Sequence, residues 1–390
     1  MGVVACLVLL AALVAAISAG CGGSDEGAST EGTSNGGSAT TGGATVEETT
    51  GEPTTGEPSE EPEKPYAALE PSEDAVVLSE SVGEDLTREV LGFEDAVSGA
   101  SGDQYANEGT AGPRQPERSV PLGETLLSGA EDRSDGPLKE NRIVAYYGTP
   151  LSELMGILGE SEPEVMMEQL KEQTQAYSDA DPERPAVPAI EFIASVAQRD
   201  PGPAGLYVSQ TDPEVIEEYS RLAEENDALL ILDVQLGGAT IMDEIEILED
   251  FLRRPHVHLA IDTEYSIEEG QIPGVDLGTV DGADIQEAVE YFDELVETEN
   301  IPDKLLMIHQ FDAGIVTNKE AIQPTDNVQV ALHADGFGTP EAKFSKYGLL
   351  VRDEPIQYGG FKVFYQQDTP VLEPEQVLAL DPAPAIVTYQ

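Results

Sequence analysis

The stretch VHLAIDTE, residues 257–264, decides the fold class of this 390-residue chain. A mostly apolar run of this length is typical of a strand buried in a parallel sheet. The run ends in two carboxylates, Asp262 and Glu264. Polar residues at the carboxyl end of a buried parallel strand mark the edge where sites of α/β proteins are built. The stretch therefore predicts a buried strand with functional groups at its end.

The same pattern occurs eight times between residues 142 and 390. The predicted strands are residues 143–147, 187–193, 228–234, 257–262, 304–311, 328–334, 361–365 and 385–389. Amphipathic helices are predicted between several of them, because apolar residues recur every three or four positions over 241–252 and 285–296. Helix starts are predicted at Asp212, which Pro213 follows, and at Ser161, where Glu164 would complete a capping box.

Alternating strands and helices imply parallel strand pairing through crossovers. Eight such units predict an α/β fold, a single (βα)8 barrel of the TIM type over residues 142–390, which fits the typical length of about 250 residues. A doubly wound open sheet is the alternative. It is disfavoured because the end of the first predicted strand, YYGTP at 146–150, lacks the G-x-G-x-x-G phosphate turn.

Polar side chains gather at the carboxyl ends of the predicted strands. In a barrel those ends form one rim, so we expect the side chains to surround a common mouth. The alternative is that they only mark where each strand leaves the core for solvent. The residues are Tyr146, Tyr147, Glu191, Asp233, Gln235, Asp262, Glu264, His309, Gln310, His333, Asp335, Gln366, Asp368 and Gln390.

Two of these residues predict acid–base chemistry. Asp262 and Glu264 are two positions apart, which on a strand puts both side chains on one face with Cα atoms about 6–7 Å apart. Carboxylates this close separate each other's pKa values, so one can act as an acid and the other as a base or nucleophile.

A fold-level analogy assigns roles. A large class of barrel glycoside hydrolases places its acid after the fourth strand and its nucleophile after the seventh, the positions of Glu264 and Asp368 here. The candidate catalytic residues are therefore Glu264 as general acid and Asp368 or Asp262 as nucleophile or base, with retaining and inverting hydrolysis both open.

The remaining rim residues are candidate ligand-binding groups. Sugar rings usually stack on aromatic faces, and since the chain has no Trp, that role would fall to Tyr146, Tyr147, Tyr265, Phe337 or Tyr365. The candidate ligand-binding set is Tyr146, Tyr147, Glu191, Asp233, Gln235, His309, Gln310, Asp335, Gln366 and Gln390.

Two other classes of function stay open. A non-catalytic surface binding protein would keep the barrel and its mouth without turnover. A metal-dependent hydrolase could use ligand-type side chains at the rim, namely His309, His333, Asp335, Asp262 and Glu264. Because the sequence has no H-E-x-x-H motif and no cysteine ligand set, we assign neither a metal nor a cofactor. His256 and His258, at the start of a strand, are expected to be structural.

The N-terminus resembles a bacterial lipoprotein signal. Residues 3–17 are almost entirely apolar, and Ser18, Ala19 and Gly20 precede Cys21. The resemblance implies that residues 1–20 are removed, that Cys21 is acylated, and that the body is anchored to the cell membrane on its extracytoplasmic side. Two features depart from the pattern: no Lys or Arg precedes the apolar run, and Ser18 stands where Leu is usual. An uncleaved transmembrane anchor is the alternative.

Residues 21–141 are predicted to form a mostly disordered acidic linker. They are rich in Gly, Ser, Thr, Glu and Pro and repeat the sequence TTGEP at 49–53 and 54–58. Such a composition buries too little apolar area to offset the entropy of ordering.

The charge of the chain limits its partners. With 19 Lys plus Arg against 76 Asp plus Glu, the net charge is −57. A field of this sign repels nucleic acid and anionic lipid head groups, so the predicted partners are the bilayer, through Cys21, and a neutral or cationic polyhydroxylated ligand such as a glycan. Residues 142–390 carry 13 basic and 49 acidic residues, a charge of −36, which indicates a surface adapted to high salt. The chain is expected to be a monomer.

Residues 142–390 resemble a family of secreted actinobacterial lipoproteins with a barrel domain. The resemblance rests on YYGTPL at 146–151 with MGILG at 155–159, residues 255–262, HQF at 309–311 with TNK at 317–319, DGFG at 335–338, GFKVFY at 360–365 leading to QDTP at 367–370, and YQ at 389–390. It implies a secreted barrel and no particular reaction.

Overall fold

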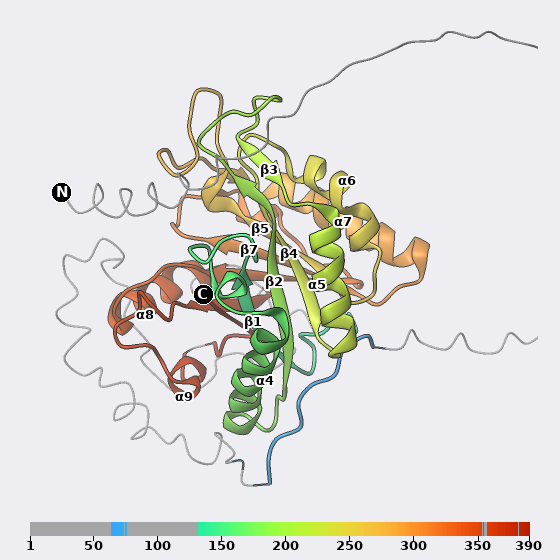
Figure 1. The fold of residues 1–390 in the computed structure, drawn as a ribbon, viewed down its shortest axis with the longest axis vertical. Helices are drawn as coiled ribbons and strands as arrows, with labels where there is room; N and C mark the ends of the chain where they lie inside the picture. The colour runs from blue at the N-terminus through green and yellow to red at the C-terminus, as the bar shows by residue number, and fades with distance from the viewer. Residues whose placement is uncertain (1–63, 74, 76–131, 353, 355–356, 381) are drawn as a thin grey trace, which may run out of the picture. The chain divides into compact units, whose positions relative to one another are not determined.

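The computed structural model describes residues 64–73, 75, 132–352, 354, 357–380 and 382–390 (Figure 1). The predicted signal peptide, Cys21 and most of the predicted linker lie outside these residues. Within the described residues, no helix combines the length and the apolar character that crossing a membrane requires.

Eight parallel strands close into a barrel. Each strand pairs in parallel with its neighbours, and β1 pairs with both β2 and β11, which joins the two ends of the sheet. This confirms the predicted (βα)8 barrel and excludes the doubly wound sheet, which would have two free edges. The strands are β1 (Arg142–Gly148), β2 (Ala186–Ala197), β4 (Leu229–Gln235), β5 (Val257–Asp262), β7 (Lys304–Gln310), β9 (Val328–Ala334), β10 (Tyr358–Val363) and β11 (Ile386–Tyr389).

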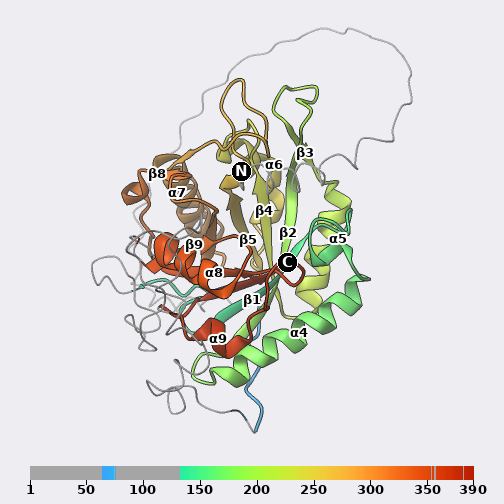
Figure 2. The ribbon, with the colours of Figure 1, turned by 90° about the vertical axis from the view of Figure 1, so that its left-hand side faces the viewer.

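Helices follow most of the strands and cover the outside of the barrel (Figures 1 and 2). They are α4 (Pro163–Ala180), α5 (Pro213–Glu225), α6 (Ile241–Leu252), α7 (Gly282–Glu299), α8 (Pro340–Tyr347) and α9 (Pro374–Leu378). Shorter pieces complete the fold: helical turns η2 (Ile157–Gly159), η3 (Thr263–Tyr265), η4 (Lys319–Ala321) and η5 (Gly348–Arg352), and strands β3 (Val208–Gln210), β6 (Val280–Asp281) and β8 (Val316–Thr317).

The sequence signals for helix starts are met at one of the two predicted sites. Asp212 caps α5, because its side chain accepts a hydrogen bond from the Glu214 N–H and Pro213 occupies the first turn. The capping box predicted at Ser161 is wrong: α4 begins at Pro163 with Glu162 at the N-cap and no side-chain cap. A proline that fixes φ can start a helix without a capping side chain.

The hydrophobic core has two layers. Side chains that point outward from the strands pack against apolar side chains of the helices, such as Ile245 and Leu248 of α6. Each such buried aliphatic side chain contributes about 1.5–3 kcal/mol to stability. Side chains that point inward, such as Ile143, Ala189 and Met307, fill the barrel itself. Because strand side chains alternate between the two faces, every second residue of each strand faces the barrel axis.

Segments before β1 close the amino-terminal end of the barrel. Leu138 is fully buried among the inward-facing residues, and its N–H donates to Gln329 Oε1 at 2.9 Å. The Ala67 N–H donates to the Asp227 carbonyl at 2.9 Å, and the Leu69 N–H to the Ala186 carbonyl at 2.9 Å. With this end covered, the carboxyl ends of the strands are where a site can open.

Candidate functional site

A ring of polar side chains lines the inside of the barrel at the carboxyl ends of the strands. Every one of the eight barrel strands, or the residue just after it, contributes to this ring. We call it the mouth, and define it as Tyr147, Glu191, Asp233, Gln235, Asp262, His309, His333, Asp335, Lys362 and Thr388.

His309 lies between two carboxylates of the mouth. Its Nε2 is 2.7 Å from Glu191 Oε1, and its Nδ1 is 3.1 Å from Asp335 Oδ2. Burial alone would lower the pKa of His309, but Glu191 and Asp335 outweigh burial and hold it well above its ordinary value. At neutral pH the side chain is therefore an imidazolium that donates to both carboxylates. Thr388 fixes Glu191 from the other side, with Oγ1 donating to Oε2 at 2.8 Å.

Lys362 places a second positive charge in the mouth. Its Nζ is 3.1 Å from Asp335 Oδ2 and 3.6 Å from the centre of the Tyr147 ring. Burial disfavours the charged amine, but Asp335 and then Glu191 raise the pKa of Lys362 above its usual value. In turn, Lys362 and His309 outweigh burial at Asp335 and keep the pKa of that carboxyl well below its usual range. Two cations and two anions thus form one compact network.

Asp233 lies in the mouth without a partner. Among the described residues, neither of its carboxyl oxygens has a hydrogen-bond partner, and the side chain is fully buried. Burial, and then the nearby Asp262, raise the pKa of Asp233 well above its usual value, which favours the protonated form of this carboxyl. An unpaired buried carboxyl is costly for folding, and such groups concentrate at functional sites.

Asp262 of the mouth and its neighbour Glu264 show the clearest acid–base asymmetry. The structure ends β5 at Asp262 and places Glu264 in turn η3, so the two are not on one strand as predicted. Burial raises the pKa of Asp262 to about 6, and His309 opposes this rise. Glu264, in turn η3 and half-buried, has its pKa raised to about 8 by burial and by the charges of Asp262 and Asp335. At neutral pH Asp262 is therefore mostly ionised while Glu264 carries a proton. Tyr265 is half-buried and lies close to both carboxyls, whose charges help to raise the pKa of its hydroxyl.

His333 fills the centre of the barrel beneath these groups. Its ring centre is 4.6 Å from that of His309, and burial together with the charge on His309 lowers the pKa of His333 well below its usual value. Gly360 on β10 makes room for this ring, because a Cβ there would lie 2.3 Å from His333 Cδ2. His333 is therefore neutral and packed, whereas His309 is charged.

Asp368 lies outside the mouth, in a structural ion pair. Its Oδ2 is 2.7 Å from Lys343 Nζ, and its two oxygens accept from the Gly338 and Phe364 N–H groups at 2.9 Å each. Both ionic side chains are buried. These contacts hold the carboxylate against Lys343 and two backbone N–H groups outside the mouth, so the structure gives no support to the catalytic role expected for Asp368.

Three further rim residues, Tyr146, Gln310 and Gln366, point away from the mouth. Tyr146 precedes inward-facing Tyr147, and Gln310 follows inward-facing His309, so strand alternation turns both side chains outward. Gln310 Nε2 donates to the Leu350 carbonyl at 3.1 Å. Gln366 is exposed and donates to Glu160 Oε1 at 2.8 Å. Gln390 directly follows β11, and its backbone N–H donates to the Val363 carbonyl at 2.8 Å, a contact that holds the backbone and does not place the side chain.

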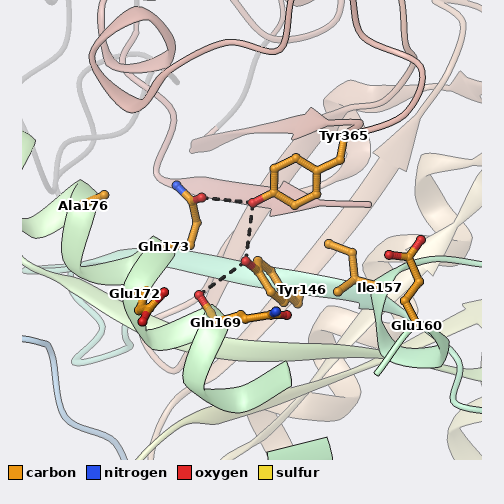
Figure 3. Close-up of a pocket in the computed structure, with 8 residues that line it drawn as sticks. All are labelled: Tyr146, Ile157, Glu160, Gln169, Glu172, Gln173, Ala176 and Tyr365. Atoms are coloured by element: carbon orange, nitrogen blue, oxygen red, sulfur yellow. Dashed lines mark hydrogen bonds between the residues drawn. The ribbon is translucent and has the colours of Figure 1, made fainter. Parts of the chain in front are cut away.

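Tyr146 instead lines a cavity on the outer side of β1, beside α4 (Figure 3). The structure therefore brings together Tyr147, Glu191, Asp233, Gln235, Asp262, Glu264, His309 and Asp335 from the predicted set.

Sequence reasoning missed two residues of the mouth, Lys362 and Thr388. The seventh strand was placed at residues 361–365, but β10 spans Tyr358–Val363, so its last inward-facing residue is Lys362. A lone lysine inside an otherwise apolar strand was the signal that could have found it. Thr388 could have been found from β11, because it lies two residues after inward-facing Ile386 and is the inward-facing polar residue of that strand.

The two histidines at the other end of β5 are structural, as expected. His258 Nδ1 accepts from the Leu305 N–H at 3.1 Å, and His256 Nε2 lies 3.0 Å from Ser220 Oγ. Within the described part of the chain, no group of three or more His, Cys, Asp or Glu side chains has an arrangement that could hold a metal ion.

The fold and the site define a TIM-type α/β barrel with a mouth rich in carboxyl groups. No protein-family model and no curated protein matches the chain. Solved structures that are similar to it include two endo-β-1,4-mannanases, each at 11% sequence identity. A ruminal GH26 endo-β-1,4-mannanase has a TM-score of 0.33 over 70% of this chain and 66% of that protein. A double mutant of a Cellulomonas fimi endo-β-1,4-mannanase has a TM-score of 0.28 over 81% of this chain and 70% of that protein.

Proposed function

We propose that the barrel is an acid–base hydrolase that acts on a glycan at its mouth. The observation that carries the proposal is the pair formed by Glu264, whose pKa is about 8, and Asp262, whose pKa is about 6. Between these values one carboxyl holds a proton that it can donate and the other is free to accept one, which is the division of roles that glycoside hydrolysis requires.

In the proposed reaction, Glu264 donates its proton to the glycosidic oxygen as the bond to the anomeric carbon breaks. Asp262 either takes a proton from the water that attacks this carbon or attacks it directly and is released by water later. The first route inverts and the second retains the anomeric configuration, so the configuration of the first product distinguishes them. In the first route Glu264 ends ionised and Asp262 ends protonated, and exchange with solvent returns the proton from Asp262 to Glu264. In the second route Glu264, ionised by the first step, takes a proton back from the water that releases the sugar from Asp262.

The charged network supports Asp262 in this role. The imidazolium of His309 lowers the pKa of Asp262 against the effect of burial, and so keeps part of this carboxyl ionised at neutral pH. Half-buried Tyr265 offers an aromatic face next to Glu264 for a sugar ring. A neutral ligand suits a mouth in which His309 and Lys362 balance Glu191 and Asp335, so that ionised Asp262 is the one further charge the ligand meets.

The pH dependence of turnover tests the proposal. Asp262 must be ionised and Glu264 protonated, so kcat/KM on a neutral polysaccharide should rise through pH 6, fall through pH 8 and peak near pH 7. Glu264→Gln should lower kcat by about 10²–10⁴-fold and Asp262→Asn by a similar factor. The matched control is Glu268→Gln, an exposed glutamate in the same segment, which should leave the profile unchanged. Full activity of Glu264→Gln, or no turnover of any polysaccharide in a broad panel, would refute the proposal.

A non-catalytic binding protein is the second candidate, and one observation favours it. The strand after which an analogous hydrolase would carry its nucleophile, β10, brings Lys362 to the mouth, while Asp368 is held by Lys343. This candidate predicts that wild type and Glu264→Gln bind the same glycan with equal affinity and that neither turns it over.

We further propose, from the sequence alone, that Cys21 anchors the protein to the extracytoplasmic face of the membrane. The apolar run before it and the small residues at 18–20 motivate this proposal. Full-length protein should fractionate with membranes and be extracted by detergent, whereas Cys21→Ser should lose the lipid mass. A protein with Cys21 intact that keeps residues 1–20 and carries no lipid mass would instead favour the uncleaved anchor.

A further inference from the structure

A cavity of about 440 Å³ lies outside the barrel, next to α4 (Figure 3). This volume is within the range of small-ligand sites, roughly 300–1,000 Å³. The cavity is separate from the mouth, because Tyr146 and Tyr147 are consecutive on β1 and point to opposite sides of the barrel wall. Tyr365, which follows β10, contributes the opposite side of the cavity.

Tyr365 forms a fixed aromatic surface in this cavity. Its hydroxyl donates to Gln173 Oε1 at 3.0 Å and lies 3.4 Å from the Tyr146 hydroxyl. One side of the ring packs on Tyr389, with ring centres 5.0 Å apart and planes tilted by 30°. The side chain nevertheless remains 40% exposed. An aromatic ring that is held in place and still exposed loses little entropy when a ligand packs on it.

Side chains of α4 face this ring and have unused hydrogen-bonding groups. Gln169, Glu172, Gln173 and Ala176 follow the i, i+3, i+4, i+7 spacing of one helix face. Within the described part of the chain, the side chains of Gln169 and Glu172 make no hydrogen bond, and both are exposed. Gln169 offers a donor and an acceptor, and Glu172 offers acceptors.

The charge of the lining selects among ligands. Glu160 and Glu172 line the cavity, and no Lys or Arg does. Phosphates, sulfates and uronic acids are therefore disfavoured. An aromatic face combined with amide and carboxylate groups matches a sugar, whose C–H face packs on the ring while its hydroxyls donate to carboxylate and amide oxygens.

We propose that this cavity is an accessory binding site for a neutral sugar residue of a glycan, separate from the mouth. The sugar ring packs on Tyr365, and adjacent hydroxyls bind Gln169 and Glu172. Such a site would hold a polymer on the protein while the mouth engages another part of it. The proposal does not rest on hydrolysis at the mouth.

The test uses full-length protein with Asp262→Asn and Glu264→Gln, so that turnover cannot interfere. Affinity electrophoresis with soluble neutral polysaccharides (mannan, β-glucan and xylan) measures binding. In this background we expect at least one of these polymers to retard the protein. Tyr365→Ala should weaken the binding at least tenfold, which is about the effect of losing one central contact. The double variant Gln169→Ala, Glu172→Ala should weaken the binding by a similar factor.

Two controls separate binding from folding. Tyr365→Phe keeps the ring and should retain most of the affinity, and Glu168→Ala, an exposed α4 residue outside the cavity, should retain all of it. Unchanged retardation of Tyr365→Ala, or no retardation by any neutral polymer, would overturn the proposal. Preferential retardation by cationic chitosan that salt abolishes would also overturn it, because the ligand would then be an organic cation. If the retarding polymer is not hydrolysed by protein that keeps Asp262 and Glu264, that result would count against the hydrolase alone.

Discussion

At the scale of single residues, the carboxyl groups around the mouth divide by what pairs with them. Glu191 and Asp335 are held by His309, and Asp335 also by Lys362. Among the residues that the structure describes, no cation is in hydrogen-bond contact with Asp262 or Glu264, and burial therefore raises both of their pKa values. The paired carboxyls organise the site, while the unpaired ones can exchange protons.

Asp368 is also a carboxylate paired with a cation, Lys343, and this buried ion pair leads to a stability prediction. Asp368→Ala would leave the Lys343 ammonium buried without its counter-ion. Breaking a buried ion pair in this way costs about 3–5 kcal/mol, so the free energy of unfolding should fall by roughly that amount. Urea unfolding followed by circular dichroism measures the loss.

The double variant Asp368→Ala, Lys343→Met is the matched control for this prediction. It removes both charges, so it should recover a large part of the lost stability. A catalytic role for Asp368 would instead show as lost turnover with an unchanged midpoint of unfolding.

At the scale of elements, strand alternation explains which parts of the site the sequence could predict. Apolar runs with polar ends located all eight strands, and β5 and β9 were predicted to the residue. The pattern identified the residues at the rim but did not show whether each side chain points into the barrel or out toward the helices. Neighbours such as Tyr146 and Tyr147 were therefore grouped together although they lie on opposite sides of the wall.

Strand ends limited the prediction in a second way. A shift of two residues in the end of β10 moved the expected site residue from Lys362 to Gln366. Such a shift cannot be read from apolar pattern alone, because Phe364 and Tyr365 are as suited to a strand as Phe361 and Val363 are. The end of β10 is set by its pairing with β11, in which the last pair is Val363 with Tyr389. This pairing joins residues that are distant in sequence, so a local pattern does not reveal it.

Contacts across the barrel were equally beyond local reasoning. Glu191 and His309 are 118 positions apart, and Lys343 and Asp368 lie on different connections. Sequence spacing suggested that Asp262 and Glu264 act together, because that pair is local. It could not show that His309 would be cationic, since this depends on two carboxylates from distant strands.

At the scale of the whole molecule, the acidic surface determines how stability depends on salt. Residues 142–390 carry a net charge of −36, and only a few of these acids lie at the mouth. Glutamates such as Glu214, Glu218 and Glu224 lie exposed on α5. Repulsion among exposed charges of one sign opposes folding, and salt screens it over about 10 Å at 0.1 M and about 3 Å at 1 M.

We therefore expect added NaCl to stabilise the protein. A gain of about 1–2 kcal/mol between 0.05 and 1 M NaCl would raise the unfolding temperature by roughly 2–8 °C. Differential scanning calorimetry at a fixed pH of 7 measures the shift. Because screening acts on surface repulsion, Glu218→Gln with Glu224→Gln should be more stable than wild type at 0.05 M NaCl and should gain less from added salt. A midpoint that stays constant or falls as NaCl is added would show that the acidic surface does not limit stability, and the charge would then need an explanation in a cationic partner rather than in the solvent.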